Sequence, residues 1–383
     1  MIDFANSFTL ILKNNMTKEE KNKILGSMVG GAVGDALGYA VEFMSYSDIV
    51  ARYGKKGITR YELDSQGVAE ISDDTQMALF VANGLMLGDT YISDKGIGSP
   101  HNYDSGALYA WYITQTQKFD TPRKKYYSQF WLMDDPRMFA RRAPGVTCMG
   151  ALSGKLKTNK SKGCGGIVRI APQALYEYRF TGLPREKRWE ITKEMIEYTH
   201  HHPLGYMPAI LLVDVLCSIM RRSNETVVLE STVRESILAM KSLLNNKYGK
   251  YLIMLIDKAF DLAKQELPDH ESIAELGEGW TAEGTLAIAL YCATKYHNDF
   301  EKAIVASVNH SGDSDSTGAV TGNIIGAMLG RDAIPQHYID NLELVDVIEE
   351  MANDIASGAQ ICFCAPATEA EIRWAKKYVR SIF

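Results

Sequence analysis

Two short segments of this chain crowd carboxylates and hydroxyls together, with Ser-Asp-Asp-Thr at 72–75 and Asp-Ser-Asp-Ser-Thr at 313–317. Carboxylates this close repel one another unless a positive charge lies between them, and their oxygens suit hard cations such as Mg²⁺ or Mn²⁺. The two segments therefore predict a site for one or two divalent cations. The alternative is ordinary helix capping by Asp and Ser, which explains either segment alone more easily than both together.

Glycines recur at every fourth position beside both segments. On a helix this spacing places them on one stripe, and each glycine costs about 1 kcal/mol relative to alanine. Close packing of two backbones would offset that cost. We therefore expect two central helices side by side, which would bring Glu42 to both acidic segments. The two sets are Gly26, Gly30, Gly34 and Gly38, and Gly318, Gly322, Gly326 and Gly330.

Composition limits the classes of function. The 383 residues are 46% hydrophobic, enough for a large core in one big domain or two modest ones. The net charge of -6 gives no general footprint for nucleic acid or an anionic membrane, and no apolar run approaches the ~18 residues of a membrane span. The six cysteines lack zinc-finger spacing. We expect a monomer with reduced thiols in the cytoplasm, and no nucleic-acid or membrane partner.

Helical periodicity dominates the chain, at 210–219, 252–262 and 286–293, whereas 58–63 is the best strand candidate. The pattern predicts a predominantly α-helical domain. Thr17 to Glu20 reads as a capping box that opens the first core helix. Residues 1–16 then form an N-terminal extension, and residues 17–383 a single domain. Phe4, Phe8 and Leu12 would share one face of a short helix that contacts a partner protein; the alternatives are packing on its own domain, or a true start at Met16.

Two further motifs have the character of a binding site. The Gly-rich turn at 163–172 can expose backbone N–H groups to a phosphate, or can be merely a tight turn. Three consecutive histidines begin at His200. They cannot all face one metal from a regular element, so we expect a single histidine that contacts a ligand.

The order of these motifs resembles the ADP-ribosylglycohydrolase family over roughly residues 24 to 330. The resemblance rests on the following segments: 34–38 with Glu42, Ser72–Thr75, Gly163–Pro172, Thr199–Tyr206, Gly277–Glu283 and Gly312–Ser316. It implies an all-α fold, in which residues 17–383 form a single compact catalytic domain with a dinuclear Mg²⁺ or Mn²⁺ centre in a central cleft. Cys164 stands where asparagine is often found.

The resemblance also implies roles for individual residues. The metal ligands would be Ser72, Asp73, Asp74, Asp313, Asp315 and Ser316. The catalytic set would be Glu42, Asp74 and Asp313. The substrate-binding set would be Ser161, Gly163 and Gly165 at the diphosphate, with His200 beside the ADP-ribose.

The expected reaction is hydrolysis of the bond between ADP-ribose and a modified protein side chain, arginine by analogy. The substrate is then an ADP-ribosylated protein, and the chain could protect against an ADP-ribosyltransferase toxin. One alternative is an antitoxin-like immunity protein that blocks such a transferase by contact, through residues 1–16. Another is a dinuclear-metal hydrolase of free ADP-ribose-type nucleotides. The sequence does not identify the general acid.

Overall fold

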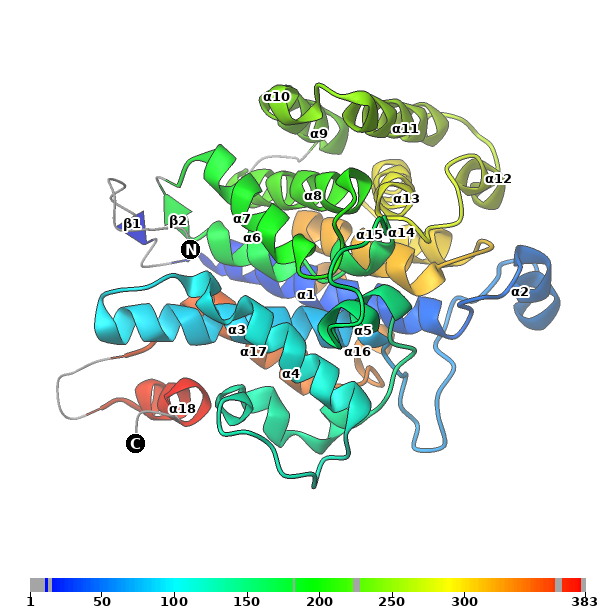
Figure 1. The fold of residues 1–383 in the computed structure, drawn as a ribbon. Coiled ribbons are helices and arrows are strands. Elements are labelled where there is room, and N and C mark those ends of the chain that lie inside the picture. Colours follow the sequence, from blue (N-terminus) through cyan, green and yellow to red (C-terminus); the bar gives the residue numbers. More distant parts are fainter. Residues whose placement is uncertain (1–10, 13–15, 182, 223–227, 362–366, 380–383) are drawn as a thin grey trace.

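The computed structural model describes residues 11–12, 16–181, 183–222, 228–361 and 367–379. Helices form almost all of its regular structure, which confirms the all-α prediction (Figure 1). The longer helices are α1 (Lys18–Tyr39), α3 (Asp73–Lys95), α4 (Asp104–Thr116), α7 (Arg185–Glu197), α8 (Pro203–Arg221), α9 (Leu229–Ala239), α11 (Lys247–Ala263), α13 (Ala282–Lys295), α14 (Phe300–Val308), α15 (Ser314–Leu329), α17 (Val345–Ser357) and α18 (Glu369–Tyr378). The shorter ones are α2 (Tyr46–Tyr53), α5 (Val146–Leu152), α6 (Ala171–Glu177), α10 (Lys241–Leu244), α12 (Asp269–Ala274) and α16 (Gln336–Ile339).

The helices α1 and α15 lie antiparallel at the centre of the molecule, in direct backbone contact. A methyl group on Gly30 would lie 2.5 Å from the carbonyl oxygen of Gly322, and one on Gly34 would overlap the carbonyl of Gly318. Ser27 Oγ also donates to Asn323 O at 3.0 Å. The glycine stripes are therefore packing surfaces, as their spacing predicts, and any larger side chain would push the two helices apart.

This antiparallel register determines where the acidic segments meet. Gly38, near the end of α1, packs against Ser314, the first residue of α15. The turn after α1 carries Glu42, and Asp313 is the N-cap of α15. The first acidic segment begins α3, with Ser72 as its N-cap. Three helix ends thus converge at one end of the central pair.

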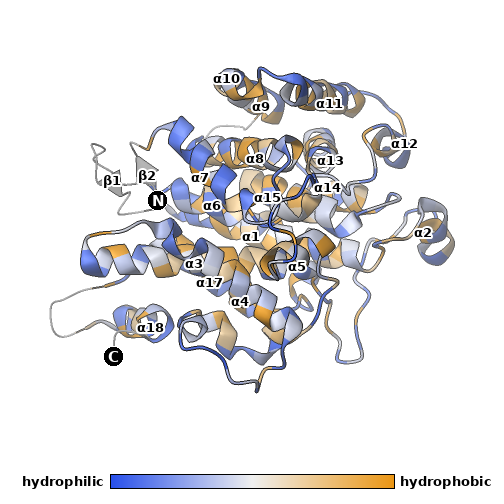
Figure 2. Cartoon of the chain, in the orientation of Figure 1, coloured by the Kyte–Doolittle hydropathy of each residue, from blue (hydrophilic) through white to orange (hydrophobic). Residues whose placement is uncertain are grey.

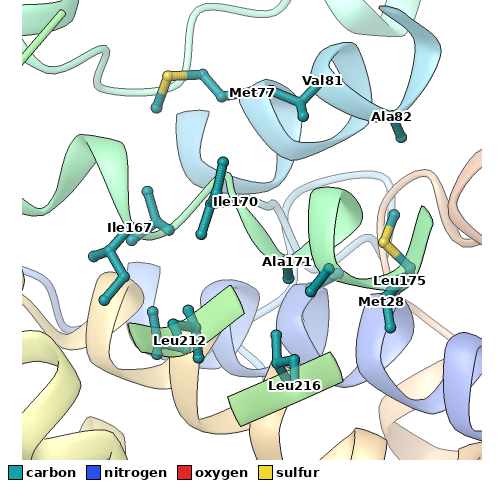
Figure 3. Close-up of a cluster of buried hydrophobic side chains, with 14 of the residues drawn as sticks. Met28, Met77, Val81, Ala82, Ile167, Ile170, Ala171, Leu175, Leu212 and Leu216 are labelled. Atoms are coloured by element: carbon teal, nitrogen blue, oxygen red, sulfur yellow. The ribbon is translucent and has the colours of Figure 1, made fainter. Parts of the chain in front are cut away.

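Helices α3, α6 and α8 pack around this pair and supply much of the core. Figure 3 shows Met77 and Val81 of α3 at the top of a buried apolar cluster, Ile167 and Ile170 in the middle, and Leu212 of α8 below. Burying side chains of this size stabilises the fold by about 1.5–3 kcal/mol each before entropy is counted. The cluster holds α3 and the loop before α6 in place over α1 and α15.

Hydropathy follows the same arrangement: α8 is mostly hydrophobic, whereas the peripheral α7 is largely hydrophilic (Figure 2). Among the described residues, α8 is the one helix long and apolar enough to cross a membrane, so the expectation that no apolar run approaches that length is wrong. However, 83% of its most apolar stretch is buried inside the molecule, as expected of a core helix.

The N-terminal predictions have mixed outcomes. Thr17 caps α1 through a complete capping box with Glu20, as predicted. Residues Ile11–Leu12 form strand β1, paired antiparallel with β2 (Phe180–Thr181), so the predicted helix is wrong at Leu12. Phe4 and Phe8 lie outside the described residues. The predicted strand at 58–63 is also wrong, because this segment follows an irregular path without a ladder partner.

Replacing Gly322 by alanine should destabilise the protein by about 1–3 kcal/mol, because its methyl group would overlap the carbonyl of Gly30. Thermal unfolding measures the effect. Gly284→Ala in α13 is the matched control, since a methyl group there meets its nearest neighbour at 3.3 Å, and helix propensity favours alanine. Equal melting temperatures for the two variants would contradict the central packing.

Candidate active site

The first acidic segment is held by a buried carboxylate that sequence reasoning did not assign to the site. Asp35 on α1 is fully buried. Its oxygens accept the backbone N–H of Ser72 at 3.0 Å and of Thr75 at 3.1 Å, and Thr75 Oγ1 also donates to it. Ser72 Oγ in turn accepts from Asp74 N at 3.2 Å. Asp35 therefore fixes the start of α3, and with it the direction of the Asp73 and Asp74 carboxylates.

The second acidic segment meets both Glu42 and the first segment. Carboxylate oxygens of Glu42, Asp313 and Asp315 all lie within 4.8 Å of one another. Ser316 Oγ donates to Asp74 Oδ2 at 2.7 Å, which joins α15 to α3. The structure thus brings Glu42 and the two acidic segments into one site.

Asp73 lies at the edge of this site, facing the loop before α5. Its Oδ2 accepts the backbone N–H of Gly145 at 3.3 Å, and its own N–H donates to Arg142 O at 2.9 Å. Arg142 then pairs with Glu70 at 2.9 Å and with Glu343 at 2.8 Å. The site is therefore tied to the segment between α4 and α5, which the motif pattern did not single out.

Burial and mutual repulsion shift the pKa values of the acidic groups upward. Desolvation, and then the neighbouring Asp315 carboxylate, raise the pKa of Asp73, Asp74 and Asp313 well above the usual range. The same two causes raise the pKa of Glu42 to about 9 and that of Asp35 to about 7. Without a compensating charge, the folded protein therefore keeps protons on carboxyl groups that would ionise in water.

The donor set fits a divalent cation. Among the residues that the structure describes, none of the carboxylates of Glu42, Asp73, Asp74, Asp313 and Asp315 forms an ion pair with a lysine, arginine or histidine. Five buried or half-buried carboxylates with hydroxyl neighbours are ligands for a hard cation such as Mg²⁺ or Mn²⁺. A cation would supply the positive charge that the protein itself does not.

The Gly-rich turn lies directly beside these carboxylates. Cys164 Sγ donates to Asp313 Oδ2 at 2.9 Å, and the 3₁₀ turn Cys164–Gly166 leads toward α6. Ser161 Oγ accepts the N–H of Gly163 at 3.3 Å. The imidazole of His200 lies against both Gly163 and Gly165. The four residues predicted to bind substrate are therefore neighbours, and the Cys164 thiol connects their loop to the acidic site.

The comparisons with known proteins agree with this arrangement. The model of the ADP-ribosylglycohydrolase family matches residues 16–362, and the chain belongs to that family. Members generally use divalent metal ions in the active site. The match begins at Met16, next to the predicted boundary of the N-terminal extension.

Three curated relatives match most of the chain. It is 23% identical over 339 residues to the ADP-ribosyl-[dinitrogen reductase] glycohydrolase of Rhodospirillum rubrum (84% of this chain, 91% of that protein). It is 24% identical over 377 residues to the ADP-ribosylhydrolase ARH3 of Danio rerio (90% and 92%). It is 25% identical over 342 residues to the ADP-ribosylarginine hydrolase Tri1 of Pseudomonas putida (86% and 76%).

A solved structure described as an ADP-ribosylglycohydrolase-related protein complex has the same fold. It superposes with a TM-score of 0.54 at 22% identity, and covers 89% of this chain and 99% of the other. Together with the family match, this fold and the acidic site support a glycohydrolase that acts on ADP-ribosylated substrates.

The raised carboxyl pKa values predict how stability depends on pH. Because the folded state binds protons that the unfolded state releases, the stability of the metal-free protein should fall as pH rises from about 4 to about 9. Between about pH 5.5 and pH 8.5 we expect the melting temperature to drop by roughly 5 °C. Added Mn²⁺ should raise the melting temperature more at the higher pH, because fewer protons must then be displaced from the carboxyl groups when the cation binds.

Differential scanning fluorimetry with and without chelator measures this slope. Asp315→Asn removes the carboxylate that raises the pKa of its neighbours, so its metal-free slope should be shallower. If chelator and Mn²⁺ gave the same slope in the wild-type protein, the carboxylates would not be a cation site.

Proposed function

We propose that this protein is a divalent-cation-dependent hydrolase that releases ADP-ribose from modified protein side chains, with ADP-ribosylarginine as its principal substrate. One observation carries the proposal: the carboxylates of Glu42, Asp313 and Asp315 converge beside a glycine loop that is bonded to the same Asp313. A cation site for the sugar and a loop for the phosphates are what an ADP-ribosyl substrate requires.

The two acidic segments would hold two cations, through Ser72, Asp73, Asp74, Asp313, Asp315 and Ser316. Bound divalent cations orient ribose hydroxyls and make water a stronger nucleophile near neutral pH. The loop would bind the diphosphate through Ser161, Gly163 and Gly165, beside His200. The sugar would then lie between the loop and the carboxylates, with its anomeric carbon toward Glu42.

Hydrolysis places the hydroxyl of water on the anomeric carbon and its proton on the departing side chain. The carbon becomes oxocarbenium-like as the bond breaks, and nearby carboxylates stabilise that positive charge. Asp74 and Asp313 would orient the attacking water. Glu42 is half-buried and lines both the acidic site and the cavity beside it, so it is placed to hold the proton in transit.

The cavity beside Glu42 supports an arginine leaving group. It has a volume of about 500 Å³ and is lined by Tyr39, Glu42, Glu62, Asp64 and Glu70. Arg52 pairs with Glu62, and Arg142 with Glu70 and Glu343. The lining thus carries four acidic side chains and no lysine or arginine, which favours a cationic side chain such as a guanidinium.

Backbone strain also marks this cavity. Phe43 and Ala143 line it with φ angles of 65° and 48°. Residues other than glycine avoid this region at a cost of about 1–3 kcal/mol, and such strain tends to persist at functional sites. The geometry of the cavity wall is therefore maintained against a local energetic cost, in keeping with a role in holding the departing side chain.

Purified protein with Mg²⁺ should release ADP-ribose from an ADP-ribosylated arginine peptide, and faster than from serine or glutamate peptides. Asp74→Ala and Asp315→Ala should each abolish release while leaving the circular dichroism spectrum unchanged. Each removes a carboxylate from the cation site, so the cations that would orient the sugar and activate the water would no longer be held. Free ADP-ribose is quantified by chromatography.

The same assay separates the alternatives. Release with full rate in chelator would contradict the cation requirement. Turnover of free ADP-ribose-type nucleotides, with modified peptides left intact, would favour the nucleotide hydrolase. If the wild-type protein turned over nothing but blocked an ADP-ribosyltransferase in a labelling assay, and deletion of residues 1–15 relieved the block, the immunity-protein alternative would hold.

Selectivity for arginine should follow the charge of the cavity. Glu62→Gln lowers its negative charge, so kcat/KM for the arginine peptide should fall about two- to fivefold, with little change for the serine peptide. Arg52→Gln removes the cation that pairs with Glu62 and should shift selectivity in the opposite direction. Parallel changes for both peptides in both variants would show that the cavity does not select the leaving group.

A further inference from the structure

The imidazole of His200 is buried against the glycine loop, with one ring nitrogen on each side. Its Nδ1 lies 2.8 Å from Thr199 Oγ1. Its Nε2 faces the loop, 3.4 Å from where a side chain on Gly163 would begin, and its Cε1 lies 3.4 Å from the same position on Gly165. Which nitrogen carries the proton therefore decides whether the loop meets a hydrogen-bond donor or a lone pair.

Arg169 settles the direction of the hydrogen bonds behind the ring. Its guanidinium is buried and donates to Thr199 Oγ1 at 2.9 Å, to Gly165 O at 2.6 Å and to Met195 O at 3.3 Å. A guanidinium cannot accept a hydrogen bond, so Thr199 Oγ1 is an acceptor toward Arg169. The hydroxyl hydrogen of Thr199 is then left for a second partner.

Three acceptors lie within reach of that hydrogen, and the Cys148 sulfur is the weakest of them. Ile196 O lies 3.5 Å from Thr199 Oγ1, at the limit of a hydrogen bond, whereas His200 Nδ1 lies at 2.8 Å. Ile196 O already accepts the backbone N–H groups of Thr199 at 3.0 Å and His200 at 2.9 Å, so both of its lone pairs are used. The hydroxyl hydrogen therefore goes to His200, and Nδ1 accepts. Burial, with Arg169 and His201 nearby, also lowers the pKa of His200 to about 3, so the ring is neutral at physiological pH. A neutral imidazole that accepts at Nδ1 carries its proton on Nε2.

We propose that Arg169 and Thr199 are positioning residues that hold His200 in its Nε2–H tautomer, and that this N–H donates to a diphosphate oxygen of a nucleoside-diphosphate ligand in the 163–165 loop. The inference rests on the proposed function for the identity of the ligand. A diphosphate offers only acceptors, so the opposite tautomer would turn a lone pair toward it and lose the hydrogen bond.

Neutrality of the ring has its own advantage here. A charged imidazolium would be repelled by the buried Arg169 guanidinium and by any cations held at the acidic site. A neutral donor binds the phosphate without opposing the cations. Arg169 also joins ring and loop mechanically, because it bonds both Gly165 and Thr199.

Nitrogen-detected NMR of protein labelled with ¹⁵N-histidine reads the tautomer directly. His200→Gln identifies the His200 signals by their absence. The wild-type protein should show protonated Nε2 and unprotonated Nδ1, with Nε2 shifting on addition of ADP-ribose. Thr199→Val, which keeps the side-chain shape but removes the hydroxyl, should show a mixture of tautomers, and Thr199→Ser should restore the wild-type signals.

Calorimetry with ADP-ribose in Mg²⁺ measures the consequence for binding. Thr199→Val should weaken the Kd about three- to tenfold, the loss expected for one hydrogen bond, and Thr199→Ser should remain near the wild type. His200→Gln, whose amide N–H can replace the Nε2 donor, should bind more tightly than His200→Asn. Adenosine, which lacks the diphosphate, should not distinguish these variants.

A wild-type ring protonated on Nδ1, or equal ADP-ribose affinity in Thr199→Val and wild type, would overturn the proposal. If Thr199→Val failed to fold, the order of His200→Gln and His200→Asn would still decide it. If the wild-type protein did not bind ADP-ribose, the proposal would be overturned too. Intact binding and the Nε2–H tautomer without any hydrolysis would instead contradict only the proposed function.

Discussion

The contact between the backbones of α1 and α15 is the constraint on which the rest of the structure depends. Each glycine lowers the helix propensity of its position, but it lets the two helix backbones approach more closely than any larger residue would permit. The antiparallel register fixed by this contact places the end of one helix beside the start of the other. Glu42 and Asp313 meet because the stripes of Gly30 and Gly322 mesh, and a slip of one turn would separate them by about 5 Å.

Repulsion among the carboxylates of the acidic site is not neutralised by any cationic side chain that pairs with them in the described part of the chain. Asp35 is the clearest sign, because a buried carboxylate is spent on positioning the start of α3 rather than on binding a ligand. Its hydrogen bonds from Ser72 and Thr75 oppose the shift that burial and Asp315 impose on its pKa. Beside the acidic groups, the glycine loop is supported by the buried guanidinium of Arg169, which donates to Gly165 O and Thr199 Oγ1.

The sequence predicted the parts of this arrangement that depend on spacing. Glycines four residues apart share one face of a helix, and the capping box at Thr17 marks where a helix begins. Both depend only on local helix geometry. The paired acidic segments predicted a cation site. The glycine-packed helix pair predicted that Glu42 would meet Asp313 and Asp315. Asp35 lies in the 34–38 motif, but its role was not predicted, because the hydrogen bonds that it accepts from Ser72 and Thr75 join residues distant in sequence. The cavity beside Glu42 depends on how the irregular segment at 58–70 folds, and the pairing of Leu12 with the β2 strand depends on a partner distant in sequence; neither leaves a periodic signal.

The central pair has a consequence for how the chain is made. Ser27 and Asn323, which hydrogen-bond across α1 and α15, are separated by 296 residues. At about 5–20 residues per second, a ribosome needs roughly 15–60 s to cover that distance. Throughout this interval α1 has been synthesised without the helix that covers its glycine stripe. Such late, long-range closure predicts slow folding, and the nascent chain would depend on protection of its first helix until its last third has emerged.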